Sequence, residues 1–427
     1  MQTPLRPTRE AKIPGLAAAP GPGTRTAWRR FRGPSGIVAA VLWILVLSTL
    51  LHQSRYPSLW GRYSREWMIV IGAALILATA VTLAQFRRKK ARRGGDWRYM
   101  VAAVVLSALV SMAALEASMR MFNLLGSSFY SEIRRYSQVM RPDPVLYYGN
   151  PRSFRGVFQH VEVSTNQLGL RERPLVAKSP DRTRVLVLGD SVAFGWGVPA
   201  GLVASRELER RLQQRTGAAV ETINSGVPGY NTLQEQLFLK TYGDALQPDL
   251  VLLLYVDNDT DYLDTSKPFV PGMPNPIERP LAAADYVLSS SRVLFMARHL
   301  APVVLSFLMP PAADESRTPG WRSSMQSLSG IAAFCQSRRI PFVTFLYRLT
   351  ADPHTDRLRI ALSGAAQHEQ FYFSDTLPWF ANRNFRRLVN SFVDSHPNAA
   401  GHQILGDGMA EFLLSHPGLL SPARKAR

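Results

Sequence analysis

The sequence predicts an α/β domain with a parallel sheet and helices on both faces, preceded by three transmembrane helices. Two patterns predict this. From residue 184 onward, short runs of β-branched and other apolar residues alternate with amphipathic segments, and three long apolar stretches lie upstream. Alternating strands and helices are typical of a doubly wound sheet, whose site lies at the carboxyl ends of its strands. We divide the chain into an arm (1–35), a membrane region (36–118), a connecting lead-in segment (119–183) and the α/β domain (184–427).

The three apolar stretches cover residues 36–51, 67–86 and 99–118. Each is about long enough for a helix that crosses a hydrocarbon core of roughly 30 Å. The second stretch contains no charged residue, which favours a membrane span over the alternative of a buried helix in a soluble domain. A cleaved signal peptide is set aside because no small-x-small cleavage site follows the first stretch.

The distribution of charge predicts the orientation in the membrane. The formal net charge is +19, and residues 1–35 and 87–98 each carry seven Lys or Arg against a single acidic residue. Lys and Arg are retained on the cytoplasmic side of membranes. We therefore expect a bacterial inner-membrane protein with a disordered cytoplasmic arm and an extracytoplasmic α/β domain. Because the excess charge flanks the spans, nucleic acid is not an expected partner.

Each element of the α/β domain follows from its own pattern. Residues 250–256 form an uninterrupted apolar run, as expected of a parallel strand buried on both faces. The remaining strands and helices follow from shorter apolar runs and from helical spacing. Strands are predicted at 185–188, 219–224, 250–256, 340–347 and 369–373, and helices at 202–214, 232–242, 321–338 and 399–414.

An insertion at residues 259–320 interrupts this order. It contains five prolines between residues 268 and 280, followed by an apolar stretch at 287–308. Charged residues and a proline in the middle of that stretch argue against a fourth span. We expect an amphipathic helix that lies on the domain or on the membrane surface.

Candidate site residues stand after three predicted strands and before the last helix. They are Ser191, Gly226, Asn258, and the pair Asp394 and His396. A serine hydroxyl is a weak nucleophile and needs an adjacent base. His396 can supply that base, and Asp394 can hold the imidazole in the required tautomer. The N–H groups of Ser191 and Gly226 and the Asn258 amide can stabilise an oxyanion, each donor contributing about 3–4 kcal/mol.

This set of residues resembles the SGNH (GDSL) hydrolase family, which is named after a Ser, a Gly, an Asn and a His in four blocks of this order. In this chain they are Ser191, Gly226, Asn258 and His396, with Asp394 completing the triad. The family pattern covers roughly residues 184–414, apart from the insertion. The resemblance implies a flavodoxin-like sheet, ester hydrolysis, and neither a cofactor nor a metal.

Other polar residues are weaker candidates for chemistry. Asp190 is expected to support the serine turn through hydrogen bonds to the backbone. His402 is interpreted as a structural residue of the last helix, and Cys335 as a small core residue. Asp257 and Asp261 lie near Asn258, but no further acidic or histidine block has ligand spacing, so we interpret them as solvated loop carboxylates without a metal.

The leading functional hypothesis is a membrane-anchored serine esterase that removes acyl groups from an extracytoplasmic polysaccharide or lipid. Acetyl is the acyl group expected. Residues 165–171 resemble the lead-in of bacterial membrane-tethered family members, which often occur with exopolysaccharide genes; polysaccharide-export partners of this chain are unknown. One alternative is an O-acyltransferase that passes the acyl group to an exported polysaccharide. The other is a non-catalytic module that binds glycan.

Overall fold

The computed structural model describes residues 41–44, 46–48, 71–72, 74–75, 78–82, 97–123, 126, 128–264, 266, 269, 271, 291–294, 297, 316 and 318–420. The chain divides into two compact units, Met1–Leu115 and Glu116–Arg427. The second unit carries the predicted site residues, and the fold described below is that of this unit.

The predicted membrane region is described only in part. Helix α4 (Trp97–Phe122) contains the third apolar stretch and continues into the second unit. Among the described residues, no helix is both long enough and apolar enough to cross a membrane. The arm at 1–35 lies outside the described residues, as do most of the first two stretches.

A five-stranded parallel sheet forms the centre of the second unit, as predicted. The strand order is β6-β5-β7-β8-β9, and every neighbouring pair is parallel. The strands are β5 (Thr183–Gly189), β6 (Val220–Asn224), β7 (Leu250–Tyr255), β8 (Phe342–Leu346) and β9 (Tyr372–Asp375). Strand β9 begins three residues later than the predicted strand at 369–373, because a helix continues to His368.

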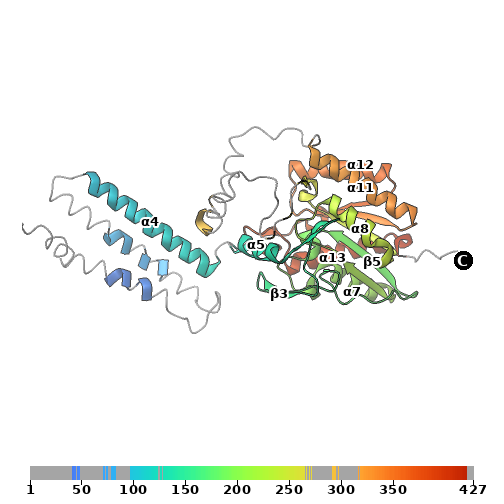
Figure 1. Cartoon of the computed structure of the whole chain (residues 1–427), viewed down its shortest axis with the longest axis horizontal. Coiled ribbons are helices and arrows are strands. Elements are labelled where there is room, and N and C mark those ends of the chain that lie inside the picture. The colour runs from blue at the N-terminus through green and yellow to red at the C-terminus, as the bar shows by residue number, and fades with distance from the viewer. Residues whose placement is uncertain are drawn as a thin grey trace, which may run out of the picture. The chain divides into compact units, whose positions relative to one another are not determined.

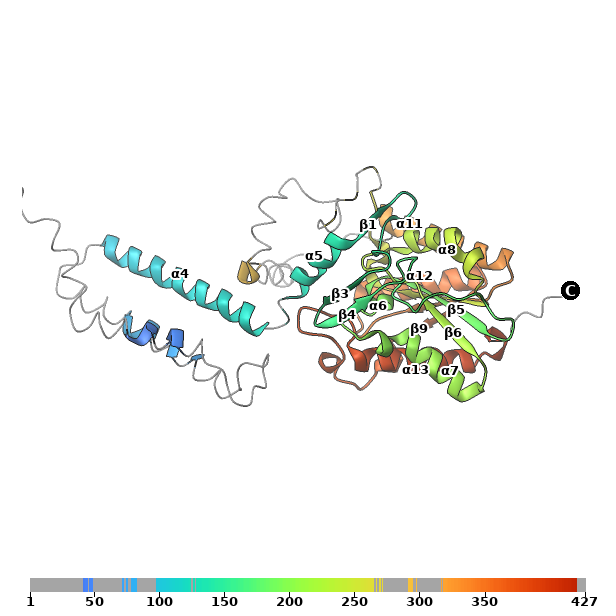
Figure 2. The same cartoon turned by 60° about the horizontal axis from the view of Figure 1, so that its bottom comes forward.

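Helices cover both faces of this sheet, again as predicted (Figures 1 and 2). Successive residues of a strand point to opposite faces. In β5, Leu186 and Leu188 belong to one hydrophobic cluster, and Val185 and Val187 belong to the other. The first cluster also contains residues of α8 (Thr232–Leu246), α11 (Pro319–Ser337) and α12 (Pro353–His368), and the second contains residues of α7 (Ala204–Thr216) and α13 (Ala399–Leu414).

Helix α12 was not predicted from the sequence. Its N-cap is Asp352, whose side chain accepts hydrogen bonds from the N–H groups of His354 and Thr355. Leu358 and Leu362, one turn apart, are fully buried against the sheet. The predicted insertion at 259–320 and the amphipathic stretch at 287–308 lie mostly outside the described residues.

The lead-in segment forms a helix and two antiparallel hairpins that belong to the second unit. These elements are α5 (Phe129–Val139), β1 (Arg141–Asp143), β2 (Tyr147–Gly149), β3 (Arg155–Phe158) and β4 (Val161–Ser164). Tyr136 of α5 is 1% exposed and packs edge-on against Phe158 and Trp196. Its hydroxyl donates to Asn150 Oδ1 at 2.9 Å, and Asn150 Nδ2 donates to Gly226 O at 3.2 Å.

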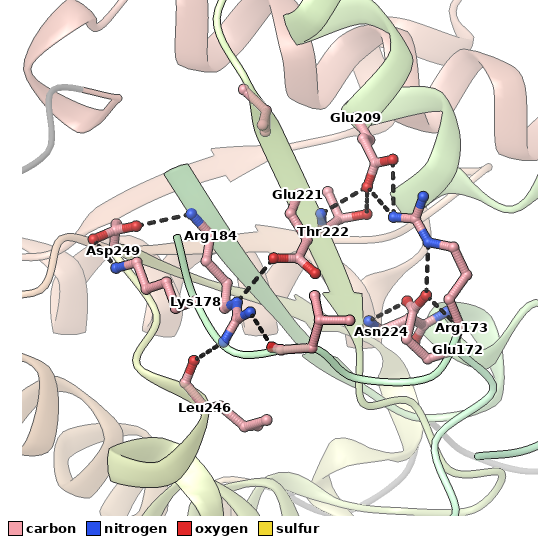
Figure 3. Close-up of polar contacts among 12 residues, drawn as sticks. Glu172, Arg173, Lys178, Arg184, Glu209, Glu221, Thr222, Asn224, Leu246 and Asp249 are labelled. Carbon is pink, nitrogen blue, oxygen red and sulfur yellow. Dashed lines mark hydrogen bonds and ion pairs between the residues drawn. The ribbon is translucent and has the colours of Figure 1, made fainter. Parts of the chain in front are cut away.

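The end of the lead-in segment also protects the edge strand β6 (Figure 3). Thr222 N donates to Glu209 Oε2 at 2.8 Å, and Asn224 N donates to Glu172 Oε2 at 3.2 Å. Arg173 in turn donates to both oxygens of Glu209 at 3.0 Å. Exposed backbone donors at a sheet edge invite pairing with another strand. Here two carboxylates occupy those donors, so the sheet ends at β6.

Candidate active site

Ser191 lies directly after β5, at the start of the short helix α6 (Ser191–Phe194). The N-cap of this helix is Asp190, which is 2% exposed. Its Oδ1 accepts from Val192 N at 2.8 Å, and its Oδ2 lies 3.0 Å from Ser191 Oγ. Burial raises the pKa of the Asp190 carboxyl. These bonds fix the turn that presents the serine, which fits the supporting role expected of Asp190.

The predicted triad is assembled. Ser191 Oγ lies 2.7 Å from His396 Nε2, and His396 Nδ1 lies 2.6 Å from Asp394 Oδ1. The backbone N–H of His396 also donates to Asp394 Oδ1, at 3.1 Å. Phe129 packs against the imidazole with ring centroids 5.5 Å apart. Nucleophile, base and orienting carboxylate are therefore connected in one hydrogen-bonded line, which is the arrangement that nucleophilic catalysis by serine requires.

Electrostatics favour a basic imidazole. Burial lowers the pKa of His396, but the hydrogen bond and the charge of Asp394, together with the charges of Asp190 and Asp257, more than offset it, so the pKa lies above its ordinary value. An imidazole with a raised pKa binds the serine proton more strongly in the transition state.

The three expected oxyanion donors have different surroundings. Ser191 and Asn258 line the pocket. Gly226 does not line it: its N–H donates to Asn224 Oδ1 at 2.9 Å, and a Cβ at this position would lie 2.3 Å from Phe194 N. The geometry therefore corrects the oxyanion role expected of Gly226, because its donor is used within the loop. The glycine of this loop that lines the pocket is Gly229.

Gly229 occupies a position that favours glycine in both backbone conformation and space. Its φ is +79°, a region that side chains rarely adopt, and a Cβ would lie 2.9 Å from the Tyr148 hydroxyl. Gly226 and Gly229 lie in one loop of the sequence. Nothing in their spacing shows that Gly226 is the glycine whose N–H donates to Asn224.

A buried network holds the turn that carries Asn258. Asp259, within the turn η3 (Asp257–Thr260), accepts from Val256 N at 2.7 Å and from Thr232 Oγ1 at 2.8 Å. Asp259 and the neighbouring Glu235 are each 1% exposed, and burial raises the pKa of both carboxyls, that of Asp259 to about 8. Burial therefore favours the protonated form of these carboxyls, and we expect Glu235 to carry a proton. Neither residue was predicted from the sequence.

A cavity of about 440 Å³ opens beside Ser191 and His396. This volume falls within the usual range of small-molecule sites. Much of the wall is apolar or aromatic and comes from the lead-in segment, while polar groups come from the loops after β6 and β7. The lead-in residues in the wall are Phe129, Ile133, Tyr136, Ser137, Met140, Tyr147 and Tyr148.

The weaker candidates lie where their expected roles place them. His402 is fully buried, accepts at Nδ1 from Ala204 N at 3.1 Å, and has its pKa lowered to about 3 by burial, so it is a neutral structural residue. Cys335 is buried in the core. Asp257 and Asp261 are exposed at the pocket. The described residues contain no group of His, Cys, Asp and Glu side chains placed to hold a metal ion.

Two residues missed by sequence analysis contact the triad. Gln159 Nε2 and Asn390 Nδ2 donate to Asp394 Oδ2 at 3.1 and 3.2 Å. Asn390 lies close to the Asp394–His396 pair in the sequence, but Gln159 lies 235 residues before Asp394, in a segment without a catalytic pattern.

Comparisons with known proteins give one family match and several similar structures. The sequence model of the GDSL-like lipase/acylhydrolase family matches residues 187–404, about half of the chain. No curated protein matches the chain. Among solved structures, the chain is similar to AlinE4, an SGNH-hydrolase family esterase, with 19% identity and a TM-score of 0.33 over 58% of this chain and all of that one. The psychrotrophic esterase EstA from Pseudoalteromonas matches with 11% identity and a TM-score of 0.36 over 55% of this chain and 99% of its own.

A third similar structure is a two-domain esterase active on acetylated mannans. It matches with 13% identity and a TM-score of 0.36, over 55% of this chain and 49% of that one.

Proposed function

Because the chain belongs to the GDSL-like lipase/acylhydrolase family, we propose that it is a membrane-anchored serine esterase acting on an acylated polysaccharide or lipid outside the cytoplasm. The observation that carries the enzymatic part is the hydrogen-bonded line from Ser191 through His396 to Asp394, beside a cavity of about 440 Å³. The chain is an ester hydrolase of the SGNH type. Its substrate and its membrane location are the proposed parts.

The triad geometry gives the order of proton transfers. Ser191 Oγ attacks the ester carbonyl while His396 Nε2 accepts the hydroxyl proton, and Asp394 stabilises the imidazolium that forms. The tetrahedral oxyanion is stabilised by Ser191 N–H, by the Asn258 amide and by Gly229 N–H, which takes the place expected for Gly226. His396 then protonates the leaving alcohol, and the acyl group stays bonded to Ser191 Oγ. A water molecule, deprotonated by His396, attacks this acyl-serine, and His396 returns the proton to Ser191 Oγ as the acid leaves.

The volume of the cavity supports a substrate larger than a simple acetate ester. An acetyl group fills only a small part of about 440 Å³, so the cavity also receives part of the alcohol or a longer acyl chain. Aromatic rings such as Tyr147 and Tyr148 offer flat apolar surface, and the exposed carboxylates Asp257 and Asp261 offer acceptors for hydroxyl groups. A sugar bearing acetyl groups combines both requirements, and we propose it as the substrate class.

The proposed anchor is supported by the sequence. The three apolar stretches and the basic clusters at 1–35 and 87–98 favour a cytoplasmic N-terminus and an outward-facing hydrolase. Protease treatment of intact spheroplasts tests the orientation: we expect cleavage of the hydrolase domain without lysis, and protection until lysis would place the domain in the cytoplasm.

The substrate is tested with the full chain in detergent. Release of acetate from O-acetylated polysaccharides is compared with turnover of p-nitrophenyl esters of increasing chain length, with Ser191→Ala as the control. We expect acetate release that depends on Ser191 and a preference for short acyl chains. A preference for long chains would indicate a lipase, and acyl transfer to an added sugar in excess of hydrolysis would indicate a transferase.

A further inference from the structure

We propose that Gln159, at the tip of the β3–β4 hairpin, is a positioning residue of the triad, so that the lead-in segment is part of the catalytic centre. This inference rests on the proposed esterase function. The family match begins at residue 187, so Gln159 lies outside the part of the chain that the family describes.

The two oxygens of Asp394 have separate partners. Oδ1 accepts from His396 Nδ1 and from His396 N, at 2.6 and 3.1 Å. Oδ2 accepts from Gln159 Nε2 at 3.1 Å and from Asn390 Nδ2 at 3.2 Å. Asp394 is 1% exposed, so little bulk water is available to replace a missing donor. Gln159 therefore supplies one of the two bonds that prevent the carboxylate from rotating away from the imidazole.

The hairpin holds Gln159 in a demanding conformation. Phe158 and Val161 are paired, which leaves Gln159 and His160 as a two-residue turn, and both have positive φ, 48° and 63°. Such turns favour Asn and Gly, and strained positions persist where the surroundings fix them, often at functional sites. A second bond fixes the backbone, because Gln159 N donates to Glu132 Oε2 at 3.1 Å.

The hairpin is also attached to the segment that follows the nucleophile. The side chain of Arg171, which is 4% exposed, donates to Gly195 O at 2.6 Å and to Phe194 O at 3.0 Å. The same guanidinium donates to Glu162 O of β4 at 3.3 Å. The lead-in segment therefore contacts Asp394 through Gln159, and through Arg171 it contacts the end of the helix α6 that begins at Ser191. Residues 165–171, which resemble the lead-in of tethered family members, provide this second attachment.

Loss of the hydrogen bond from Gln159 to Asp394 should affect the chemical step more than substrate binding. Gln159 is not part of the cavity wall, so its loss leaves the contacts with substrate in place. Asp394 then holds His396 less firmly and stabilises the imidazolium less. We expect the turnover number to fall while KM stays near its original value.

Three variants of the full chain in detergent test the inference: Gln159→Ala, the isosteric Gln159→Glu, and His160→Ala as the matched control at the exposed neighbour in the same turn. We expect Gln159→Ala to lower kcat about tenfold with KM within about twofold. Gln159→Glu places a second carboxylate against Asp394 and should lower kcat further. His160→Ala should retain kcat. The acidic limb of the kcat/KM profile of Gln159→Ala should move to lower pH, because a loosened Asp394 raises the pKa of His396 less.

A spectroscopic readout separates this inference from the esterase function. The proton between His396 Nδ1 and Asp394 gives a downfield ¹H resonance, which we expect to shift or broaden in Gln159→Ala and to persist in His160→Ala. An unchanged resonance with unchanged kcat would overturn the positioning role, as would equal losses in Gln159→Ala and His160→Ala. Absence of ester turnover in the wild type would contradict the esterase function alone, since the resonance still reports the contact.

Discussion

Replacing Asp394 with asparagine changes only the charge and the protons of one buried side chain, and the structure predicts how the new amide orients. Gln159 and Asn390 both donate to Oδ2, so the carbonyl oxygen of the amide turns toward them and its NH₂ group turns toward His396. His396 Nδ1 must then accept a hydrogen bond. The ring proton moves to Nε2, facing Ser191, and the imidazole can no longer accept the serine proton.

The magnitude follows from the loss of the carboxylate charge. Asp394 Oδ1 lies 2.6 Å from the nitrogen that becomes part of the imidazolium. At an effective dielectric constant of about 20, unit charges at that distance attract by about 6 kcal/mol. At about 1.4 kcal/mol per factor of ten in rate, this corresponds to a loss of roughly 10⁴- to 10⁵-fold in kcat for Asp394→Asn.

The assay is turnover of p-nitrophenyl acetate by wild type and Asp394→Asn, with thermal unfolding as the check on folding. The account predicts a folded variant with kcat lowered by about four orders of magnitude and KM little changed. A folded variant within tenfold of wild type would refute the proposed role of the Asp394 charge.

Three further predictions concern the base, the oxyanion donors and the buried carboxyl pair. The wild-type kcat/KM should rise with pH through a midpoint above 6.5, because His396 must be neutral to accept a proton and its pKa is raised despite burial; a midpoint below 6.5 contradicts this. Asn258→Ala should lower kcat about 10²- to 10³-fold at an unchanged Tm, and an unchanged kcat would remove Asn258 from the oxyanion site. The pKa of Glu235 and of Asp259 is higher in the folded than in the unfolded chain, so the free energy of unfolding should fall as pH rises from about 4.5 toward 8. The glutamine of the Glu235→Gln variant does not titrate, so the Tm of this variant, measured by calorimetry, should fall less over that pH range than the Tm of the wild type. Equal falls in the two proteins would contradict a proton on Glu235.

The sheet was predictable because four of its five strands, β5, β6, β7 and β8, are buried on both faces. A run such as 250–256 has no polar interruption, and all six residues of the observed strand β7 are buried. The lead-in hairpins were not predictable in the same way, since strands of three or four residues with one exposed face leave too short a pattern. Helix α12 did carry a signal, the spacing of Leu358 and Leu362 after the cap Asp352.

The triad was predictable because its residues follow strand ends or precede a helix in a fixed order. The choice of Gly226 was not settled by sequence, since Gly226 and Gly229 share one loop and only the side chain of Asn224 decides which N–H is used. Gln159 had no local signal at all. Its role arises from a tertiary contact across 235 residues, and such contacts depend on the packing of α5 and the hairpins rather than on any motif.

The most direct test of the central claim is covalent capture of the nucleophile. The full chain in detergent is incubated with a fluorophosphonate probe, and the modified residue is identified by peptide mass spectrometry in wild type, Ser191→Ala and His396→Ala. The account predicts a single adduct on Ser191, none in Ser191→Ala and greatly slowed labelling in His396→Ala. An adduct on another residue, or undiminished labelling of Ser191→Ala, would contradict it.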